Sequence, residues 1–478
     1  SRFAAGHRWG FFPSFSAGYD IARTPYFQKM ALPVSQLKVR VSYGRLGNQN
    51  GAGLYDYIAQ MPLDAQGTNA WLLPGISSST ASKGTIAQTP KMISPYITWE
   101  KVDNANLGFD LMLFKNRLSI TADLYQRTTR DMIGPAESIP SISGIASEDR
   151  AKVNNATLRN RGWELSVSWN DKLKCGFSYG VGFNVFNYKA VVTKYNNPEG
   201  IIYNNHTGLA ANKGYYEGMD LGEIWGYCAD DLFLSNREID DYLRKVNLTA
   251  FKSNDLWRRG DLKYIDTNGD GRVDGGKGTL SDHGDLQVIG NTTPKYSFGI
   301  NLNLGYKGFE VSTLLQGVAK RDFPIAGSNY MFGGNNYNFK EHLDYFSTEN
   351  PNGYLPRLTG WKDDKDFLVN TGYNTTRYLL NAAYMRMKNL TVAYTFNKKQ
   401  LKHIGISNLK VYVTCDNLFT ITKLPKQFDP ETLNQVNMSA GGDAKNTAPG
   451  LTSPMKQNGN GMVYPMNRNF VFGLDFTF

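Results

Sequence analysis

The sequence lacks a long hydrophobic run. Although 41% of its 478 residues are hydrophobic, it has no stretch of about 18 consecutive apolar residues, which a membrane-spanning helix requires. A helical membrane span is therefore excluded. A membrane-spanning β-barrel is not excluded, because its strands alternate between apolar and polar residues and are not hydrophobic on average.

Cysteine and histidine are scarce. The three cysteines (Cys175, Cys228 and Cys415) are far apart and odd in number, which argues against a disulfide framework or a C-x-x-C metal knuckle. The five histidines show no metalloprotease spacing. No nucleophile elbow, phosphate-binding loop or dinucleotide fingerprint stands in a strand–helix setting. We therefore predict that the protein is not an enzyme.

The charge is basic but dispersed. The net charge is +10, yet Lys and Arg form no compact tract with interleaved aromatic residues, so nucleic-acid binding is not expected. The sequence opens at Ser1 in an aromatic, strand-like run, without an initiator Met or a signal peptide. An exported membrane protein needs such a signal, so we expect further sequence upstream.

Alternating apolar and polar residues are the dominant pattern. In the last segment, Phe470, Phe472, Leu474, Phe476 and Phe478 share one face, opposite Val471, Gly473, Asp475 and Thr477. The polar faces are rich in Gly, Ser, Asn, Thr and Asp, as expected for the lining of a watery lumen. This alternation predicts membrane strands, with apolar side chains toward lipid and polar side chains toward the lumen.

About eleven strands are predicted, joined alternately by tight turns and long loops. The turns are placed at 115–117, 170–172 and 306–308, and the long loops at 48–102, 132–158, 189–292, 321–378 and 421–466. Short turns on one side and long loops on the other are typical of outer-membrane barrels. The predicted strands are 8–22, 36–47, 103–114, 117–131, 159–170, 174–188, 293–305, 309–320, 380–396, 407–420 and 467–478.

Eleven strands leave two unpaired sheet edges, which a membrane strand does not tolerate. The remaining strands are therefore expected from an N-terminal part outside this sequence. If the last strand runs toward the periplasm, every tight turn falls on the periplasmic side and every long loop on the outside.

Several ordered segments carry a family resemblance. Arg8 to Ser14 followed by Ser16 to Tyr19 resembles the R-x-G-F-F-P-S…S-x-G strand of SusC/RagA-type TonB-dependent transporters. Leu37–Asn48 resembles the next strand of that family. Further matches are Trp99–Lys101, Asn106–Asp110, Asn116–Ser119, Thr128–Asp131, Arg161–Glu164, Val288–Asn291, Pro294–Tyr296, Gly308–Glu310 and Gln316–Gly317.

The resemblance implies fold, location and partners. It implies that residues 1–478 form the C-terminal half of a 22-stranded all-β transmembrane barrel, with the plug and N-terminal strands upstream. It also implies an outer-membrane active transporter that imports a glycan or an oligopeptide, is energised by TonB and works with a SusD-like lid lipoprotein. Outer-membrane lipid and a dimer of transporter–lid pairs are the other expected partners.

One loop has the spacing of a calcium site. Asp266, Asn268, Asp270 and Asp274 stand at positions 1, 3, 5 and 9 of an EF-hand loop, and Arg272 would supply the backbone carbonyl at position 7. Lys277 replaces the usual glutamate at position 12, and no helical pattern flanks the loop. Ca²⁺ that stiffens this loop is therefore weighed against a turn-rich loop whose side chains cap their own backbone.

Aromatic residues in the long loops are the candidates for contact with substrate or lid. The cluster of Tyr215, Tyr216, Trp225 and Tyr227 is expected to face the lid or to form a loop core. Two other function classes stay open beside active import. One is a passive porin or protein-translocating barrel, which would lack a plug with a TonB-interacting segment. The other is a secreted all-β binding protein, which would be soluble without detergent.

Overall fold

A computed structural model describes most of the chain. The described residues are 2–134 (apart from 31, 55, 62, 65–71, 74–81, 84–85, 88–89 and 91), 142, 150–202, 215–325, 340–359, 365–396, 401, 406–433 and 465–477. In this part of the chain, no helix combines the length and apolar character that crossing a bilayer requires.

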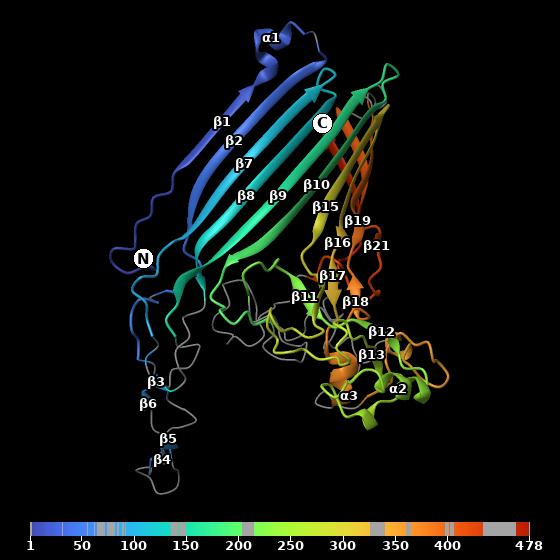
Figure 1. The fold of residues 1–478 in the computed structure, drawn as a ribbon. Coiled ribbons are helices and arrows are strands. Elements are labelled where there is room, and N and C mark those ends of the chain that lie inside the picture. Colours follow the sequence, from blue (N-terminus) through green and yellow to red (C-terminus); the bar gives the residue numbers. More distant parts are fainter. Residues whose placement is uncertain are drawn as a thin grey trace.

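One antiparallel sheet of twelve strands dominates the molecule (Figure 1). Neighbours in the sheet are neighbours in the chain, apart from short strands in the loops, so the sheet is a meander. β21 (Thr420–Thr422) pairs with β19 beyond the end of β20. The other strands are, in order, β1 (Ser14–Asp20), β2 (Val34–Asn48), β7 (Glu100–Leu113), β8 (Leu118–Gly134), β9 (Val153–Lys172), β10 (Ser178–Lys194), β15 (Lys295–Tyr306), β16 (Phe309–Lys320), β19 (Tyr384–Phe396), β20 (Asn408–Asp416) and β22 (Asn469–Thr477).

The predicted all-β fold and its eleven-strand meander are confirmed, although several strand ends differ. The strand predicted at 407–420 ends at Asp416, and β21 is an additional short strand. Residues 170–172, predicted as a turn, continue β9, and Asn170 pairs with Gly180. The turn lies at 173–177, where Gly176 adopts a φ of +85°. The first strand begins at Ser14 rather than at residue 8. Pro13 has no N–H for a ladder hydrogen bond, although its carbonyl accepts one from the Arg45 N–H at 2.8 Å.

Tight turns join the strands at one end of the sheet, here called the turn end. Between β15 and β16, only Lys307 and Gly308 lie outside the ladder, and both have positive φ, +48° and +91°. Two positive values define the type I′ turn, whose twist matches that of the flanking strands. A Cβ on Gly308 would also lie 2.5 Å from the Thr395 carbonyl oxygen, so this position requires glycine.

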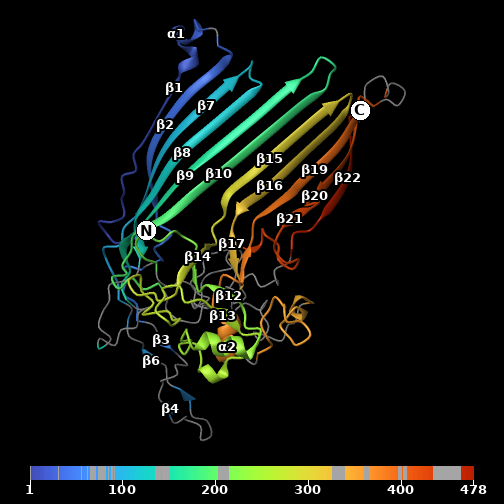
Figure 2. The ribbon, with the colours of Figure 1, turned by 45° about the vertical axis from the view of Figure 1, so that its right-hand side comes forward.

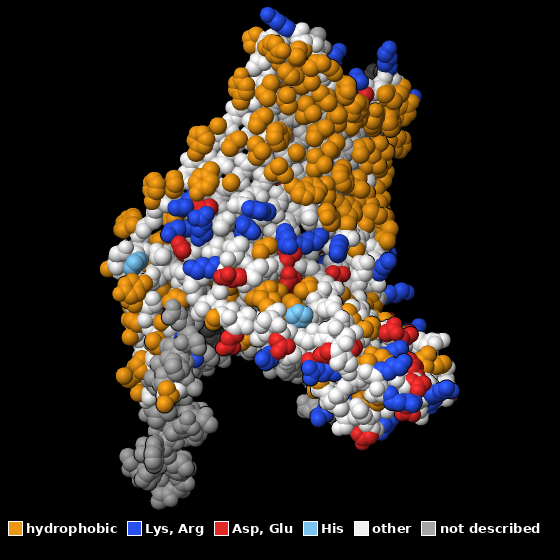
Figure 3. Space-filling view, in the orientation of Figure 1, with side chains coloured by type: hydrophobic (Ala, Val, Ile, Leu, Met, Phe, Trp, Pro, Cys, Tyr) orange, Lys and Arg blue, Asp and Glu red, His pale blue; other side chains and the backbone are white. Residues whose placement is uncertain are grey.

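The outward face of the sheet is an apolar band. Phe470, Phe472, Leu474 and Phe476 are 56%, 78%, 66% and 52% exposed. In the space-filling view, hydrophobic side chains cover the outward face of the sheet, mainly toward its turn end (Figure 3). This exposure is what lipid-facing side chains require and a globular core would not show. The strand register places Phe472 opposite Val413, which in turn lies opposite Val392. These side chains therefore share the apolar face of the sheet, and the prediction that they face outward is confirmed for the four described residues. Phe478 lies outside the described part.

The inward face is polar and internally paired. The Arg40 guanidinium contacts Asp110 at 2.7 Å and Asp123 at 3.1 Å. It lies over Gly108, where a Cβ would approach the guanidinium carbon to 2.6 Å. Glycine on this face therefore makes room for charged side chains, which explains the Gly-rich polar pattern of the sequence.

The sheet is curved and remains open at β1 and β22 (Figure 2). Within the described residues, β1 pairs only with β2, and β22 pairs only with β20. At the turn end, a short connection between β1 and β2 holds the 3₁₀ turn Ile21–Arg23 and α1 (Pro25–Gln28).

The long loops at the other end, here called the loop end, form a body with its own core. This loop body comprises residues 192–202, 215–292, 321–325, 340–359, 365–382 and 424–433, and its core includes Leu232, Phe233, Tyr264, Ile325 and Tyr378, all under 3% exposed. Its elements are β11 (Glu223–Gly226), β12 (Ala229–Leu232), α2 (Asn236–Leu243), a 3₁₀ turn (Asn254–Leu256), β13 (Leu262–Tyr264), β14 (Gln287–Asn291), β17 (Asp322–Pro324), a second 3₁₀ turn (Lys340–Leu343), α3 (Lys365–Phe367), a π-helical turn (Leu368–Gly372) and β18 (Leu379–Asn381). Separate from it, the β2–β7 loop has two small ladders, β3 (Leu63–Asp64) with β6 (Ile86–Ala87), and β4 (Leu72–Leu73) with β5 (Ser82–Lys83).

Local signals place α2, the longest helix in the described part of the loop body. Ser235 caps α2 by accepting a hydrogen bond from the Glu238 N–H at 3.1 Å, and the Glu238 carboxylate accepts one from the Leu234 N–H at 3.0 Å. This is close to the reciprocal capping-box arrangement that the sequence S-N-R-E favours. β11 and β14, 61 positions apart at Gly226 and Gln287, pair with each other and close the body on itself.

Candidate functional site

The loop body contains a cavity of about 680 Å³. This size is in the range of small-ligand sites. Its wall comes from four separate stretches of the chain, which only the fold of the loops brings together. The lining residues are Tyr227, Ala250, Phe251, Asn268, Asp270, Arg272, Asp274, Gly275, Gly276, Ser281, Asp282, His283, Gly284 and Tyr373.

One wall of the cavity is aromatic. The Tyr227 ring contacts the rings of Phe251 and Tyr373 edge-on, at centroid distances of 5.2 and 5.8 Å. Phe251 in turn stacks on Tyr264 at 4.4 Å. Such edge-to-face and offset packing is favourable beyond simple burial, and it holds this wall rigid.

The rest of the lining is mainly polar, and much of it comes from the loop that the sequence marked as a calcium candidate. Asp270, Asp274 and Asp282 carry three carboxylates, and Arg272 is the one guanidinium among the lining residues. The Arg272 Nε lies 3.1 Å from Asp270 and 3.6 Å from Asp274. The cavity therefore offers acidic oxygens against an aromatic surface.

The candidate calcium loop is folded on its own backbone. Asp266 accepts hydrogen bonds from the N–H groups of Gly269 at 2.7 Å and Gly271 at 2.8 Å. The Asn268 side-chain oxygen accepts one from the Asp270 N–H at 2.9 Å. Asp285, which is buried, holds the loop from outside by accepting from the N–H groups of Thr267 and Asp274. These hydrogen bonds are the ones expected of a turn-rich loop whose side chains cap their own backbone. Within the described residues, no group of three or more His, Cys, Asp or Glu side chains is arranged to hold a metal.

The predicted aromatic cluster divides into two environments. Tyr216, Trp225 and Tyr227 are 7%, 7% and 4% exposed and belong to the loop-body core, whereas Tyr215 is 42% exposed. The Trp225 indole N–H donates to the Tyr216 hydroxyl at 3.2 Å, and that hydroxyl donates to the Glu223 carboxylate. Only Tyr227 of the four lines the cavity.

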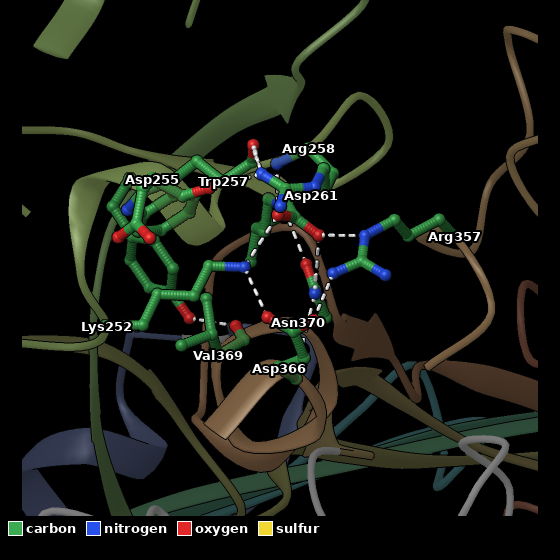
Figure 4. A network of polar contacts seen from close by, with 11 residues as sticks. Lys252, Asp255, Trp257, Arg258, Asp261, Arg357, Asp366, Val369 and Asn370 are labelled. Atoms are coloured by element: carbon green, nitrogen blue, oxygen red, sulfur yellow. Dashed lines mark hydrogen bonds and ion pairs between the residues drawn. The ribbon is translucent and has the colours of Figure 1, made fainter. Parts of the chain in front are cut away.

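A buried ionic network joins Lys252 and Asp261 to residues of a distant loop (Figure 4). Lys252 and Asp261 are fully buried, and the Lys252 Nζ lies 2.7 Å from Asp261 and 2.6 Å from Asp366. Arg357 contacts the same two carboxylates, at 2.6 Å for Asp261 and 2.5 Å for Asp366. Asn370 donates to Asp261 at 2.9 Å and accepts from the Leu262 N–H at 2.8 Å. Two cations thus bridge two anions that are 105 positions apart in the sequence.

This network could not be identified from the sequence. Lys252 and Asp261 stand in a polar stretch without periodicity, and their partners lie in another loop. Phe251 and Tyr373 of the cavity were missed for the same reason. The sequence holds one weak indication that Lys252 is buried, since Phe251 precedes it and Trp257 follows five residues later. In the structure, the Lys252 Nζ lies 4.6 Å from the centroid of the Trp257 ring.

The network makes the loop body sensitive to acid. Burial by itself would raise the pKa of the Asp366 carboxyl, but hydrogen bonds from Lys252 and Arg357 outweigh burial and hold this pKa below its ordinary value of 3.8. A carboxylate with a lowered folded-state pKa stabilises the fold above its ordinary pKa, and this stabilisation is lost as the pH falls through the folded-state pKa. We expect the protection factors of amides in residues 357–359 and 365–372, which compare the measured exchange rate with that of an unstructured amide at the same pH, to fall below about pH 4. D366N should show less of this pH dependence, and an equal acid response in wild type and D366N would contradict the assignment.

Comparisons with known proteins agree with this architecture. A family model described as TonB dependent receptor-like, beta-barrel, matches residues 1–418. TonB-dependent receptor P3 of Formosa agariphila is 25% identical over 486 residues, which cover 100% of this chain and 43% of that protein. TonB-dependent receptor SusC of Bacteroides thetaiotaomicron is 23% identical over 444 residues, covering 91% of this chain and 39% of that protein. The chain therefore spans less than half the length of these curated relatives.

The fold is also that of a solved transporter. A structure titled "Structure of the RagAB peptide transporter" superposes with a TM-score of 0.67 at 22% sequence identity, covering 100% of this chain and 44% of that chain. At this identity the likeness concerns the fold. It places the open sheet of residues 14–477 as part of a larger barrel fold.

Proposed function

Because the chain belongs to the TonB-dependent receptor-like β-barrel family, within its SusC/RagA type in the outer membrane, we propose that it forms part of the wall and outer loops of an active importer. The proposed cargo is a glycan or an oligopeptide, and the proposed energy source is TonB. The observation that carries this proposal is the combination of an apolar outward face with a polar inward face on one long antiparallel sheet. The homologues are receptors and transporters rather than enzymes, which agrees with the prediction that the protein does not catalyse a reaction.

The open edges support a barrel completed by further strands. Each edge exposes unpaired N–H and C=O groups, which cost several kcal/mol each inside a bilayer. Pairing of β1 and β22 with strands outside residues 1–478 would remove this cost. A closed barrel around a plug, with a TonB-interacting segment, is then the simplest assembly for energised import.

Uptake by whole cells tests the function. Cells that carry the full-length protein would be given labelled oligopeptides and labelled glycans, with and without a protonophore that collapses the inner-membrane potential. An energised importer loses uptake of its cargo when the potential is collapsed, whereas a passive porin retains it. Uptake that persists with the protonophore, or that is the same in a strain lacking the protein, would refute the proposal.

We propose that the loop body is the docking surface for a SusD-like lid lipoprotein. In this fold, long loops lie on the outer side of the membrane. The loop body exposes large apolar side chains there, although it also buries a core of its own. Leu343 and Leu358 are 73% and 54% exposed. The others in this group are Tyr215, Leu234, Leu256, Ile265, Leu280 and Val288.

Charge placed on this surface should weaken the complex. We expect L343D/L358D to lower recovery of the lid protein in affinity purification of the full-length transporter by about tenfold or more, since each buried anchor of an interface contributes on the order of 1 kcal/mol or more. The matched control is L173D, a similarly exposed leucine at the turn end. Unchanged recovery in the loop variant, or an equal loss in the control, would argue against this surface.

We propose that Ca²⁺ binds the loop of Asp266, Asn268, Asp270, Arg272 and Asp274. Asp270 and Asp274 already face one cation, the Arg272 guanidinium, and a carboxylate oxygen that accepts one hydrogen bond has a second lone pair free. The ion would replace the guanidinium between the two carboxylates, while Arg272 would contribute its backbone carbonyl. Its role would be to stiffen the polar wall of the cavity.

Millimolar Ca²⁺ should then protect the loop. We expect hydrogen exchange of residues 261–285 to slow with a midpoint of about 0.1–1 mM, the range of extracellular calcium modules, and chelator to reverse the effect. D270N/D274N should abolish the response, and R272Q should shift the midpoint to lower Ca²⁺. Exchange that ignores Ca²⁺ in the wild type would favour the self-capped turn.

A further inference from the structure

A row of basic side chains crosses the outward face between the apolar band and the loop body (Figure 3). Six of these side chains can be assigned from the strand register. They alternate along their strands with inward-facing residues, and they lie on the same face of the sheet as Leu107 and Leu124. They come from β2, β7, β8, β9 and β10. The six are Arg45, Lys101, Arg130, Arg159, Arg161 and Lys189.

Three of these cations have acidic partners within the row. Asp103 lies between Arg45, at 2.6 Å, and Arg130, at 3.3 Å. Lys101 pairs with Asp131 at 2.8 Å. This end of the row, over β2, β7 and β8, is therefore close to neutral.

The other three cations are arranged differently. Arg161 and Lys189 are directly opposite each other in the β9–β10 ladder, and Arg159 is the next residue of β9 on the same face. No carboxylate in the described part of the chain forms an ion pair with any of the three, and the Arg161 Nε bonds only to the neutral Gln126 side chain, at 2.6 Å. Like charges directly opposite in an antiparallel pair destabilise it, so this arrangement is expected where an external anion lies between them.

The surroundings identify the kind of anion. One step along the strands toward the apolar band, Leu124 pairs with Trp163, and Leu124 is 53% exposed. A molecule bound at this site would therefore contact the three cations at its end nearer the loop body. At its end nearer the apolar band it would contact exposed apolar side chains. This is the polarity of a lipid whose headgroup carries phosphate, since guanidinium and ammonium groups bind phosphate oxygens through short charge-assisted hydrogen bonds.

We propose that Arg159, Arg161 and Lys189 bind the phosphate of a phosphorylated glycolipid in the outer leaflet, with Gln126 beside its sugar and its acyl chains over Leu124 and Trp163. The choice of leaflet follows from the fold, in which the loop end is the outer side of the membrane. Gln126, whose side-chain oxygen accepts a hydrogen bond from Arg161, has amide N–H groups that can donate to a sugar hydroxyl. The site would anchor the barrel at a fixed depth beneath the loop body.

Lipid retention by the full-length protein tests this site. The protein would be purified from outer membranes in a mild detergent, and its bound phosphoglycolipid would be counted by native mass spectrometry and by phosphorus analysis. We expect R161Q/K189Q to bind added phosphoglycolipid about thirtyfold more weakly than the wild type, the effect expected when two basic residues near anionic headgroups are lost. R161K should retain most of the binding, because it keeps the charge.

The matched control removes two positive charges at the opposite end of the β9–β10 hairpin. K172Q/K174Q changes two exposed lysines at the β9–β10 turn and should bind as the wild type does. Heat-modifiable migration verifies that each variant is folded. Equal binding by R161Q/K189Q and the control overturns the proposal, and so does equal affinity of the wild type for phosphatidylglycerol, which carries phosphate without the phosphorylated sugar.

Discussion

The substitution D261N is expected to destabilise the loop body by about 3–5 kcal/mol, the usual cost of removing one partner from a buried ionic network. Asp261 is fully buried and accepts hydrogen bonds from Lys252, Arg357 and Asn370, as well as from the Arg258 N–H at 2.8 Å. An amide in its place is neutral and offers one acceptor oxygen. Lys252 and Arg357 would then share the single remaining carboxylate, that of Asp366.

Hydrogen exchange localises this effect. Amides of residues 248–264, 357–359 and 365–372 should lose protection in D261N. Amides in the strands of the sheet should not, because the loop body has a core of its own. The control is D255N, which makes the same chemical change at an exposed aspartate a few residues away (Figure 4). Protection that is the same in D261N and D255N would mean that apolar packing alone holds these loops.

A double variant separates the ionic contribution from packing. K252M/D261N removes one cation and one anion together, so it leaves less uncompensated buried charge than either single change. Its cost should be smaller than the sum for K252M and D261N. Strict additivity would indicate that the two side chains act independently.

An arginine in place of Phe183 should be almost as costly. Phe183 points outward from the middle of β10, between Val167 of β9 and Ile300 of β15, and it is 39% exposed. A charged side chain on the lipid face near the bilayer midplane costs about 2–4 kcal/mol. Neighbouring side chains on this face are apolar, and none offers a carboxylate to pair with.

The adjacent position provides the control. Asn184 points inward, beside Gly299 on the polar face, where an arginine can be hydrated. Urea titration of the full-length barrel in lipid vesicles should show F183R shifted to lower urea, with N184R close to the wild type. The reverse order would mean that the two faces of the sheet are assigned the wrong way round.

The strands were predictable because alternation is a local property. In Phe470–Phe476, alternation with the adjacent residues is enough to assign each side chain to one face of the sheet. The strands at 103–114, 309–320 and 467–478 were therefore located within a few residues. The errors occurred where another local factor decides. Asn170–Lys172 has the composition of a turn, but its pairing with β10 extends the strand, and Pro13 delays the start of β1.

The site was far less predictable, because distant pairings create it. The aromatic cluster from Tyr215 to Tyr227 was identified as loop core or lid-facing from composition, which does not distinguish buried Trp225 from exposed Tyr215. The cavity needs Phe251 and Tyr373, which are 122 positions apart. The ionic network needs Lys252 and Asp366, for which no periodicity or spacing gives a signal.

The shared core of the loops limits how this protein can be re-engineered. Tyr264 packs against Phe251 within its own loop, but its hydroxyl donates to the Val369 carbonyl of another loop, and Arg321 reaches the Pro430 carbonyl of a third at 3.2 Å. A chimera that imports one loop from a relative would leave these partners unmatched. Chimeras that transfer residues 192–292, 321–382 and 424–433 as a set should keep a folded exterior while changing what it recognises.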